Sequence, residues 1–356
     1  MILKALLESY PKISIRFQRN FELKLESYNL VWGAKGIGKT ALVLRYYKDT
    51  KNPLYINLED CRLNPKEDLK SLWDFCQNQS ITCLILDNYT SDFQLPQNLT
   101  SLLPNLSLTL ISQIPYEIPH FHTLEIPPIT FREYYHSHKI PPQEAFSAFI
   151  KYGNLYEAEF LQEYKGEFLK NLCEDKVDFW ILKNLLLCLG QKVSSHQIFT
   201  KLKKEGKLSK DRFYEYCGFL KASRRLFWVE KFEHHFAPKK LYFWDFTLKN
   251  AISFERNFTL LFENMVFLEL LYTFKNQVFY TDKLDFYLPQ SATGILCVPF
   301  IQPQILEQKL AKITKEREFC DKFMILNLNE SYKGESLGMP YEIVPFHKFA
   351  LENLEI

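Results

Sequence analysis

The sequence lacks paired cysteine motifs, long apolar runs and a strong net charge, and each absence excludes a class of protein. Its eight cysteines include no CxxC pair and mostly lie in apolar stretches, so we expect reduced thiols in a cytoplasmic protein rather than disulfides or a zinc site. No run reaches the roughly 18 apolar residues of a membrane helix. The N-terminus shows no signal-peptide core with a cleavage site. A net charge of +2 is too small to indicate a polyanionic partner by itself.

The composition is that of a folded protein with more than one domain. Of the 356 residues, 47% are hydrophobic and 24% are charged, as in soluble globular proteins. A chain of this length exceeds one ordinary core, so two or three domains are expected.

A glycine-rich loop follows a short apolar strand, 28–32, and precedes a helix, 41–47. This order is the context that a P-loop requires. Its glycines let backbone N–H groups surround a β-phosphate at a helix N-terminus. Lys39 is expected to reach the β- and γ-phosphates of ATP, and the Thr40 hydroxyl to bind Mg²⁺. The predicted nucleotide-binding residues are Gly33, Ala34, Lys35, Gly36, Ile37, Gly38, Lys39, Thr40 and Ala41.

Three further apolar runs, 53–58, 81–86 and 106–111, are typical of strands buried in a parallel sheet. Asp87 follows the second of them, where a Walker B aspartate would hold Mg²⁺ through water. Ser112 follows the third and is either a polar sensor near the γ-phosphate or the cap of a turn.

Asn88 stands directly after Asp87, where many P-loop ATPases have a glutamate that polarises the attacking water. An amide orients water but does not accept its proton. We therefore expect slow hydrolysis unless Glu59, Asp60 or a partner supplies the base. Lys39, Asp87, Asn88 and Ser112 are the candidate catalytic residues.

These motifs resemble prokaryotic AAA-type ATPases with a winged-helix middle and a C-terminal PD-(D/E)xK nuclease-like domain of DUF4143 type. The resemblance rests on the P-loop, with Lys35 in place of the family's arginine, and on segments 55–60, 126–135 and 149–155. Asn88 departs from the family, as does the absence of an arginine before 126–135. The resemblance implies an α/β P-loop NTPase domain, then a helical and winged-helix domain and a small α+β nuclease-like domain. Their boundaries are 1–135 for the ATPase core, 136–178 for a helical lid and linker, 179–250 for the winged helix and 251–356 for the nuclease-like domain.

The segment 179–246 reads as three helices followed by a hairpin, which describes a winged helix. The helices are expected at 180–189, at 196–204 with Ser195 as cap, and from Ser209 to 219. The strands are expected at 226–229 and 240–245. Residues 201–225 carry nine basic and three acidic side chains, which predicts DNA binding or a solvated face for packing or protein contact. The candidate DNA contacts are Lys201, Lys203, Lys204, Lys207, Lys210, Arg212, Arg224 and Arg225.

The last hundred residues read as a helix, 258–274, strands 277–281, 283–288 and 294–301, a helix, 304–318, and a strand, 322–327. Glu263 and Asp285 match two acidic positions of the nuclease-like core. The third strand offers Cys297 and Pro299 in place of the acidic ligand and lysine of a nuclease, and a thiol does not replace a hard oxygen ligand of Mg²⁺. We therefore expect no nuclease activity, with Glu263 and Asp285 as structural carboxylates.

The sequence as a whole predicts a nucleotide-dependent switch that binds ATP and Mg²⁺ and passes its state to a nucleic-acid-binding winged helix and to the inactive nuclease-like domain. The alternatives are an ATPase with real turnover and a nucleotide-binding scaffold whose partner is a protein. The oligomeric state is open, because no arginine finger can be located.

Overall fold

The structure is a computed structural model that describes residues 2–11, 19, 21–275, 277–313, 319–336 and 338–352. The chain forms two compact units, which are described separately. The first comprises residues 1–127 with 222–224, and the second residues 128–221 with 225–356. Because the second unit contains the predicted lid, winged-helix and nuclease-like segments, their division into separate domains stays a prediction.

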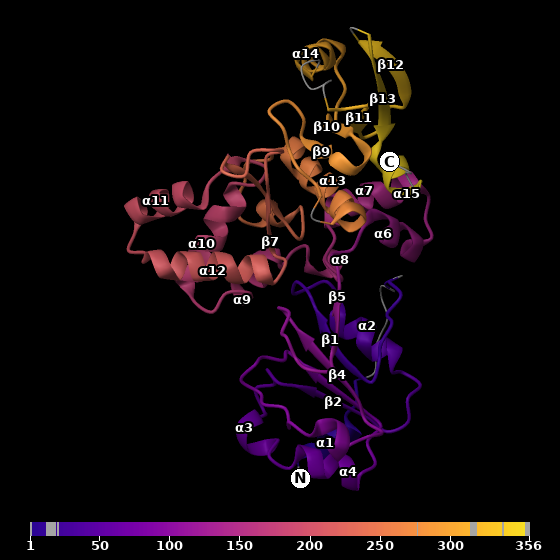
Figure 1. The fold of residues 1–356 in the computed structure, drawn as a ribbon, viewed down its shortest axis with the longest axis vertical. Coiled ribbons are helices and arrows are strands. Elements are labelled where there is room, and N and C mark those ends of the chain that lie inside the picture. The colour runs from indigo at the N-terminus through magenta and orange to yellow at the C-terminus, as the bar shows by residue number, and fades with distance from the viewer. Residues whose placement is uncertain are drawn as a thin grey trace. The chain divides into compact units, whose positions relative to one another are not determined.

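The first unit is built on a five-stranded sheet in the order β2-β3-β4-β1-β5 (Figure 1). All of its strand pairs are parallel, as the apolar runs predicted. Every residue of β3 is buried, which suits a strand covered on both faces. The strands are β1 (Tyr28–Trp32), β2 (Pro53–Asn57), β3 (Cys83–Asp87), β4 (Ser107–Ser112) and β5 (His122–Glu125), and the helices are α1 (Ile2–Glu8), α2 (Lys39–Tyr46), α3 (Pro65–Asp68), α4 (Leu72–Asn78) and α5 (Leu99–Leu102).

The strand register brings the predicted site residues to one edge of this sheet. Trp32 at the end of β1 pairs with Ser112 at the end of β4, and Asn57 at the end of β2 pairs with Asp87 at the end of β3. In parallel sheets, ligands bind beyond the carboxyl ends of the strands. The glycine-rich loop, which follows Trp32, therefore begins at the edge where Asp87 lies.

The first half of the second unit is helical and holds a small antiparallel sheet in the order β6-β8-β7. The cap of α11 is Ser194 rather than the predicted Ser195, because Ser194 and Gln197 form a reciprocal capping box. The elements are α6 (Phe131–His138), α7 (Pro142–Tyr152), α8 (Ala158–Leu161), α9 (Lys165–Asn171), α10 (Lys176–Leu187), β6 (Lys192–Val193), α11 (Ser195–Glu205), α12 (Lys210–Ala222), β7 (Leu226–Val229), β8 (Lys239–Phe243) and the 3₁₀ helix η1 (Leu248–Ala251).

The second half contains α13 and a five-stranded mixed sheet in the order β12-β13-β11-β10-β9. The predicted strand 277–281 is wrong, because only Phe279 and Tyr280 make isolated bridges there. The described part of the predicted helix 304–318 is α14 (Pro303–Ile313), and 314–318 lie outside the described residues. The elements are α13 (Phe258–Phe274), β9 (Phe286–Leu288), η2 (Pro289–Ser291), β10 (Thr293–Cys297), α14 (Pro303–Ile313), β11 (Lys322–Asn327), β12 (Tyr332–Ser336), β13 (Met339–Pro345) and α15 (Phe346–Leu351).

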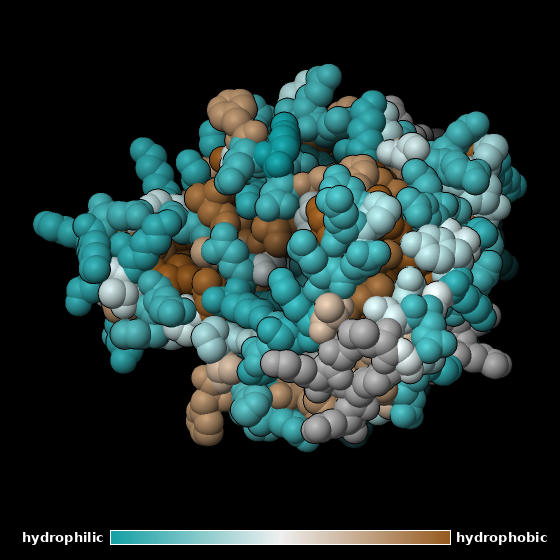
Figure 2. All heavy atoms as spheres, turned by 90° about the horizontal axis from the view of Figure 1, so that it is seen from above, coloured by the Kyte–Doolittle hydropathy of each residue, from teal (hydrophilic) through white to brown (hydrophobic). Residues whose placement is uncertain are grey.

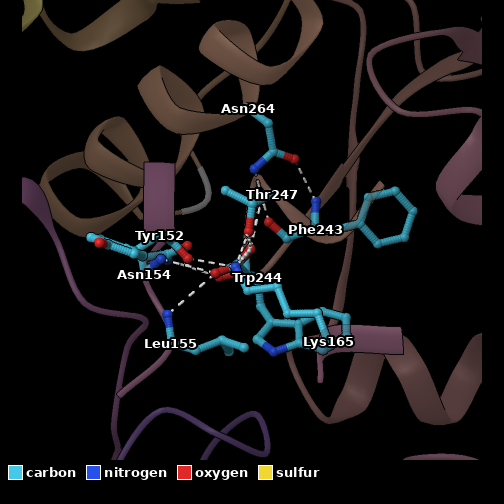
Figure 3. Close-up of polar contacts among 9 residues, drawn as sticks. Tyr152, Asn154, Leu155, Lys165, Phe243, Trp244, Thr247 and Asn264 are labelled. Carbon is cyan, nitrogen blue, oxygen red and sulfur yellow. Dashed lines mark hydrogen bonds and ion pairs between the residues drawn. The ribbon is translucent and has the colours of Figure 1, made fainter. Parts of the chain in front are cut away.

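A buried carboxylate, Asp245, connects three segments of the second unit, and Figure 3 labels four residues that contact it, Asn154, Leu155, Lys165 and Thr247. Its Oδ2 accepts the backbone N–H groups of Asn154 at 2.9 Å and Leu155 at 3.2 Å. Its Oδ1 accepts the backbone N–H of Thr247 at 2.8 Å and lies 3.8 Å from the Lys165 ammonium. Gly153 ends α7 with φ 88°, and a Cβ there would lie 2.4 Å from the carboxylate. Glycine is therefore required in the 149–155 segment for this approach as well as for the helix end.

All eight cysteines are free thiols, and Cys61 is exposed. Over the described ranges, no helix has the length and apolar character needed to cross a membrane. Within the same ranges, no group of three or more His, Cys, Asp or Glu side chains could hold a metal ion.

Candidate functional site

The glycine-rich loop has the backbone that its sequence predicted. Gly36 and Gly38 have φ angles of 86° and 85°, a region that L-residues other than glycine rarely adopt. Gly33 has φ 147°, and a Cβ there would lie 2.5 Å from the Ile126 carbonyl oxygen. Successive turns of this kind direct backbone N–H groups to one concave side, which attracts anions. The loop ends at the N-terminus of α2, where unpaired N–H groups add positive potential.

Lys39 lies inside this loop rather than in solvent. Its ammonium donates to the carbonyl oxygens of Gly33 at 2.8 Å and Ala34 at 2.9 Å, and the residue is 8% exposed. The loop therefore holds a cation at its centre, where an anionic ligand would need it.

The Walker B candidate, Asp87, lies beside the threonine of the loop. Its Oδ2 accepts the Thr40 hydroxyl at 2.8 Å and the Tyr55 phenol, also at 2.8 Å. Its Oδ1 accepts the backbone N–H of Asn88 at 2.8 Å. Burial and the adjacent Asp87 carboxylate raise the pKa of Tyr55. The phenol therefore keeps its proton and donates a hydrogen bond to the carboxylate. A hydroxyl and a carboxylate at this separation form a hard-oxygen pair of the kind that Mg²⁺ prefers.

Asn88 adopts a left-handed backbone conformation, with φ 56°, and its side chain binds the neighbouring strand. Its Nδ2 donates to Asn57 Oδ1 at 2.8 Å, and the same oxygen accepts the Glu59 backbone N–H at 3.0 Å. The amide is thus held by β2.

The two other acidic residues considered as a base have partners of their own. Glu59 lies 3.6 Å from the Lys35 ammonium in an exposed pair. Asp60 binds Arg62 at 2.7 Å, and these hydrogen bonds lower its pKa to about 2. A carboxylate with so low a pKa is a weak proton acceptor, so Asp60 is the poorer candidate.

Ser112 is buried at the end of β4, and its hydroxyl donates to the Ile114 carbonyl oxygen two residues later. This contact is the one expected of a hydroxyl that caps a turn. The sensor role stays a prediction.

Sequence reasoning missed Tyr55, Asn57 and Arg19 as site residues. Alternation along β2 was a usable signal, because it places Tyr55 and Asn57 on one face of the strand. Arg19 had no such signal. It is 3% exposed and donates through Nη1 to the Ile37 carbonyl oxygen at 2.7 Å and to that of Pro127 at 3.1 Å. It therefore fixes the outer side of the loop.

Glu263 and Asp285, the two acidic residues of the predicted nuclease-like domain, both contact Lys240. The Lys240 ammonium lies 2.7 Å from Glu263 Oε1 and 3.3 Å from Asp285 Oδ1. Burial lowers and the two carboxylates raise the pKa of Lys240, and the net shift is upward, so the ammonium stays charged. Cys297 is buried, and its backbone N–H donates to Asp285 Oδ2 at 2.9 Å.

Among the residues predicted to contact DNA, the arginines are ion-paired or buried, whereas the lysines are exposed. Arg212 pairs with Asp178 at 2.7 Å and with Asp175 at 3.1 Å. Arg225 is buried at 1% exposure. Arg224 belongs to the first unit and pairs there with Glu125 at 3.0 Å. The exposed lysine cluster comprises Lys201, Lys203, Lys204, Lys207 and Lys210.

Comparison with known proteins gave a distant similarity among solved structures and no match elsewhere. No protein-family model matches the sequence, and no curated protein matches it. Among solved structures, a Walker-type ATPase of Pyrococcus abyssi is similar at 15% identity and a TM-score of 0.37, over 64% of this chain and 91% of that one. The functional argument below rests on the residues of the site itself.

Proposed function

We propose that the chain binds ATP with Mg²⁺ at the glycine-rich loop. The observation that carries the proposal is the arrangement at its end, where the Thr40 hydroxyl lies 2.8 Å from the Asp87 carboxylate and the Lys39 ammonium lies within the loop. The backbone N–H groups bind the phosphate oxygens. Lys39 exchanges its carbonyl partners for the β- and γ-phosphates. Thr40 and Asp87 would hold Mg²⁺, which would neutralise phosphate charge.

Turnover is slow in this proposal because the residue after Asp87 brings no base. Asn88 donates its amide N–H group to Asn57 and has no carboxylate to take a proton from water. The bound nucleotide then acts mainly as a switch, and ATPase turnover remains secondary.

Calorimetric titration of ATP into the full chain tests this proposal. We expect Mg-dependent binding, and an affinity lower by about 30-fold or more in Lys39→Ala, because a buried charge contact to phosphate is lost. Lys70→Ala is the matched control, since it removes an exposed lysine of the same unit that lies outside the loop, and its affinity should stay within about two-fold. Absence of heat with the wild type, or equal affinities for Lys39→Ala and wild type, would overturn the proposal.

We further propose that the second unit binds nucleic acid through a winged helix. Three helices, α10 to α12, with the antiparallel sheet β6-β8-β7, support that domain type. The exposed lysine cluster lies at the end of α11 and in the connection to α12. Hydrophilic side chains project at the left of Figure 2, on the side that holds α11 and α12 in Figure 1. Since the arginines are ion-paired or buried, these lysines make most of the contacts, and they contact phosphates and not base edges.

DNA retention across a salt series, with and without ATP, tests this second proposal. Replacing Lys203, Lys204 and Lys207 by alanine should reduce the slope of log affinity against log salt by about three. Alanine at Lys312, Lys322 and Lys348, which are also exposed, removes the same charge and should leave the slope unchanged. A wild type without salt-dependent retention would instead favour the scaffold that recognises a protein.

We propose that residues 251–356 form a nuclease-like domain without nuclease activity. Its helix α13 supplies Glu263, and Asp285 precedes β9. The ammonium of Lys240 lies between these carboxylates at hydrogen-bond distance, in the space that a divalent ion would need to bridge them. A fixed positive charge repels such an ion. Buried Cys297 adds no oxygen ligand, so the carboxylates serve the structure.

A further inference from the structure

We propose that Tyr55 is a positioning residue for magnesium: its phenol holds the Asp87 carboxylate in the orientation that binds the metal of the nucleotide complex. The inference rests on the proposed function of the loop. It adds a residue from β2 to a site otherwise built from the loop and β3.

The position of Tyr55 follows from the alternation of β2. Leu54 and Ile56 are fully buried on one face of the strand, whereas Tyr55 and Asn57 are partly buried on the other. The register of β2 on β3 sets Asn57 opposite Asp87. The long side chain of Tyr55, two residues earlier on the same face, reaches forward to Asp87 Oδ2 at 2.8 Å.

Asp87 Oδ2 accepts two hydroxyl groups, and they have different roles. The Thr40 oxygen would bind the metal through a lone pair, while its O–H group still donates to Asp87. Tyr55 is not a metal ligand in this scheme and keeps its hydrogen bond. With the Asn88 N–H on Oδ1, it leaves the carboxylate held at both oxygens while Mg²⁺ binds. Loss of such an outer partner typically costs about 10- to 100-fold in metal affinity.

Tyr55→Phe isolates the phenol, because the ring and its packing remain. The measurement is the affinity for ATP in EDTA and across a Mg²⁺ titration, for the full chain. We expect the affinity in EDTA to stay within about two-fold of wild type. The Mg²⁺ concentration that gives half of the Mg²⁺-dependent gain in ATP affinity should rise about ten-fold. In an Asp87→Ala background, Tyr55→Phe should change neither value.

Tyr47→Phe is the matched control, because it removes a hydroxyl of the same unit that lies 3.0 Å from Thr109 Oγ1 and has no contact with Asp87 among the described residues. Its Mg²⁺ titration should coincide with that of the wild type. A Tyr55→Phe titration that also coincides overturns this inference and leaves ATP binding intact. So does an equal shift in both variants, since general loosening of the unit would explain it. A wild type that binds no ATP overturns both proposals.

Discussion

Asp245→Ala should destabilise the second unit by about 3–5 kcal/mol, the range typical of breaking a buried ion pair by removal of one partner. Asp245 is 1% exposed and accepts the backbone N–H groups of Asn154, Leu155 and Thr247. Burial lowers the pKa of Lys165, and Asp245 opposes that shift. Without the carboxylate, three N–H groups and an ammonium stay buried with fewer partners, and each such group costs free energy.

Urea unfolding monitored by tryptophan fluorescence measures this loss, and two further variants show its cause. Adding Lys165→Met to Asp245→Ala should restore about 1–3 kcal/mol of the lost free energy of unfolding, because the buried ammonium without its carboxylate is then removed. Asp282→Ala breaks an exposed pair with Lys231 in the same unit and should cost no more than about 1 kcal/mol. If Asp245→Ala and Asp282→Ala unfold at the same urea concentration, the buried cluster contributes no special stability.

The parallel sheet was predictable because its strands are short apolar runs that end in polar residues. Burial on both faces leaves few polar positions in β3, so the pattern and its end at Asp87 are visible in the sequence. The loop was predictable for a related reason, since Gly36 and Gly38 need φ angles near 86° that restrict the residue type.

The parts that sequence reasoning missed depend on contacts between distant segments. Arg19 reaches the Ile37 carbonyl oxygen, and Asp245 reaches Asn154 across 91 positions. No local periodicity records either contact. The predicted strand 277–281 failed for the opposite reason. Its short apolar run from Val278 to Tyr280 is a local signal, but only Phe279 and Tyr280 find bridge partners.

The lysine between Glu263 and Asp285 shows how a site inferred from acidic residues changes when the chain supplies the cation. In the sequence, both carboxylates match acidic positions of the nuclease-like core, and Cys297 stands where a further acidic ligand would be needed. Nothing in the sequence indicated that Lys240, from β8, would reach the carboxylates, because the pairing joins residues 23 and 45 positions apart. A buried ammonium with two carboxylates satisfies the charges that a metal would otherwise balance.

Asn88→Glu should raise the rate of ATP hydrolysis by about 100-fold, the lower end of what a positioned general base contributes. Asn88 now donates its amide N–H group to Asn57 Oδ1. A carboxylate cannot make that donation and is repelled by the same oxygen, so it turns from β2 toward the loop. Asn tolerates the left-handed backbone at this position, with φ 56°, better than Glu does. The substitution should therefore cost about 1 kcal/mol of stability.

Steady-state release of phosphate from ATP measures this gain, and Asn88→Gln is its matched control. Glutamine has the length of glutamate but accepts no proton, so its rate should equal that of the wild type. Adding Asp87→Ala to Asn88→Glu should abolish the gain, because the base then acts on a nucleotide without its Mg²⁺ contact. An equal rise in Asn88→Gln would mean that release from Asn57, rather than a base, limits turnover. If Asn88→Glu binds ATP normally yet hydrolyses it at the wild-type rate, the attacking water lies beyond reach of this position, and the base must come from elsewhere.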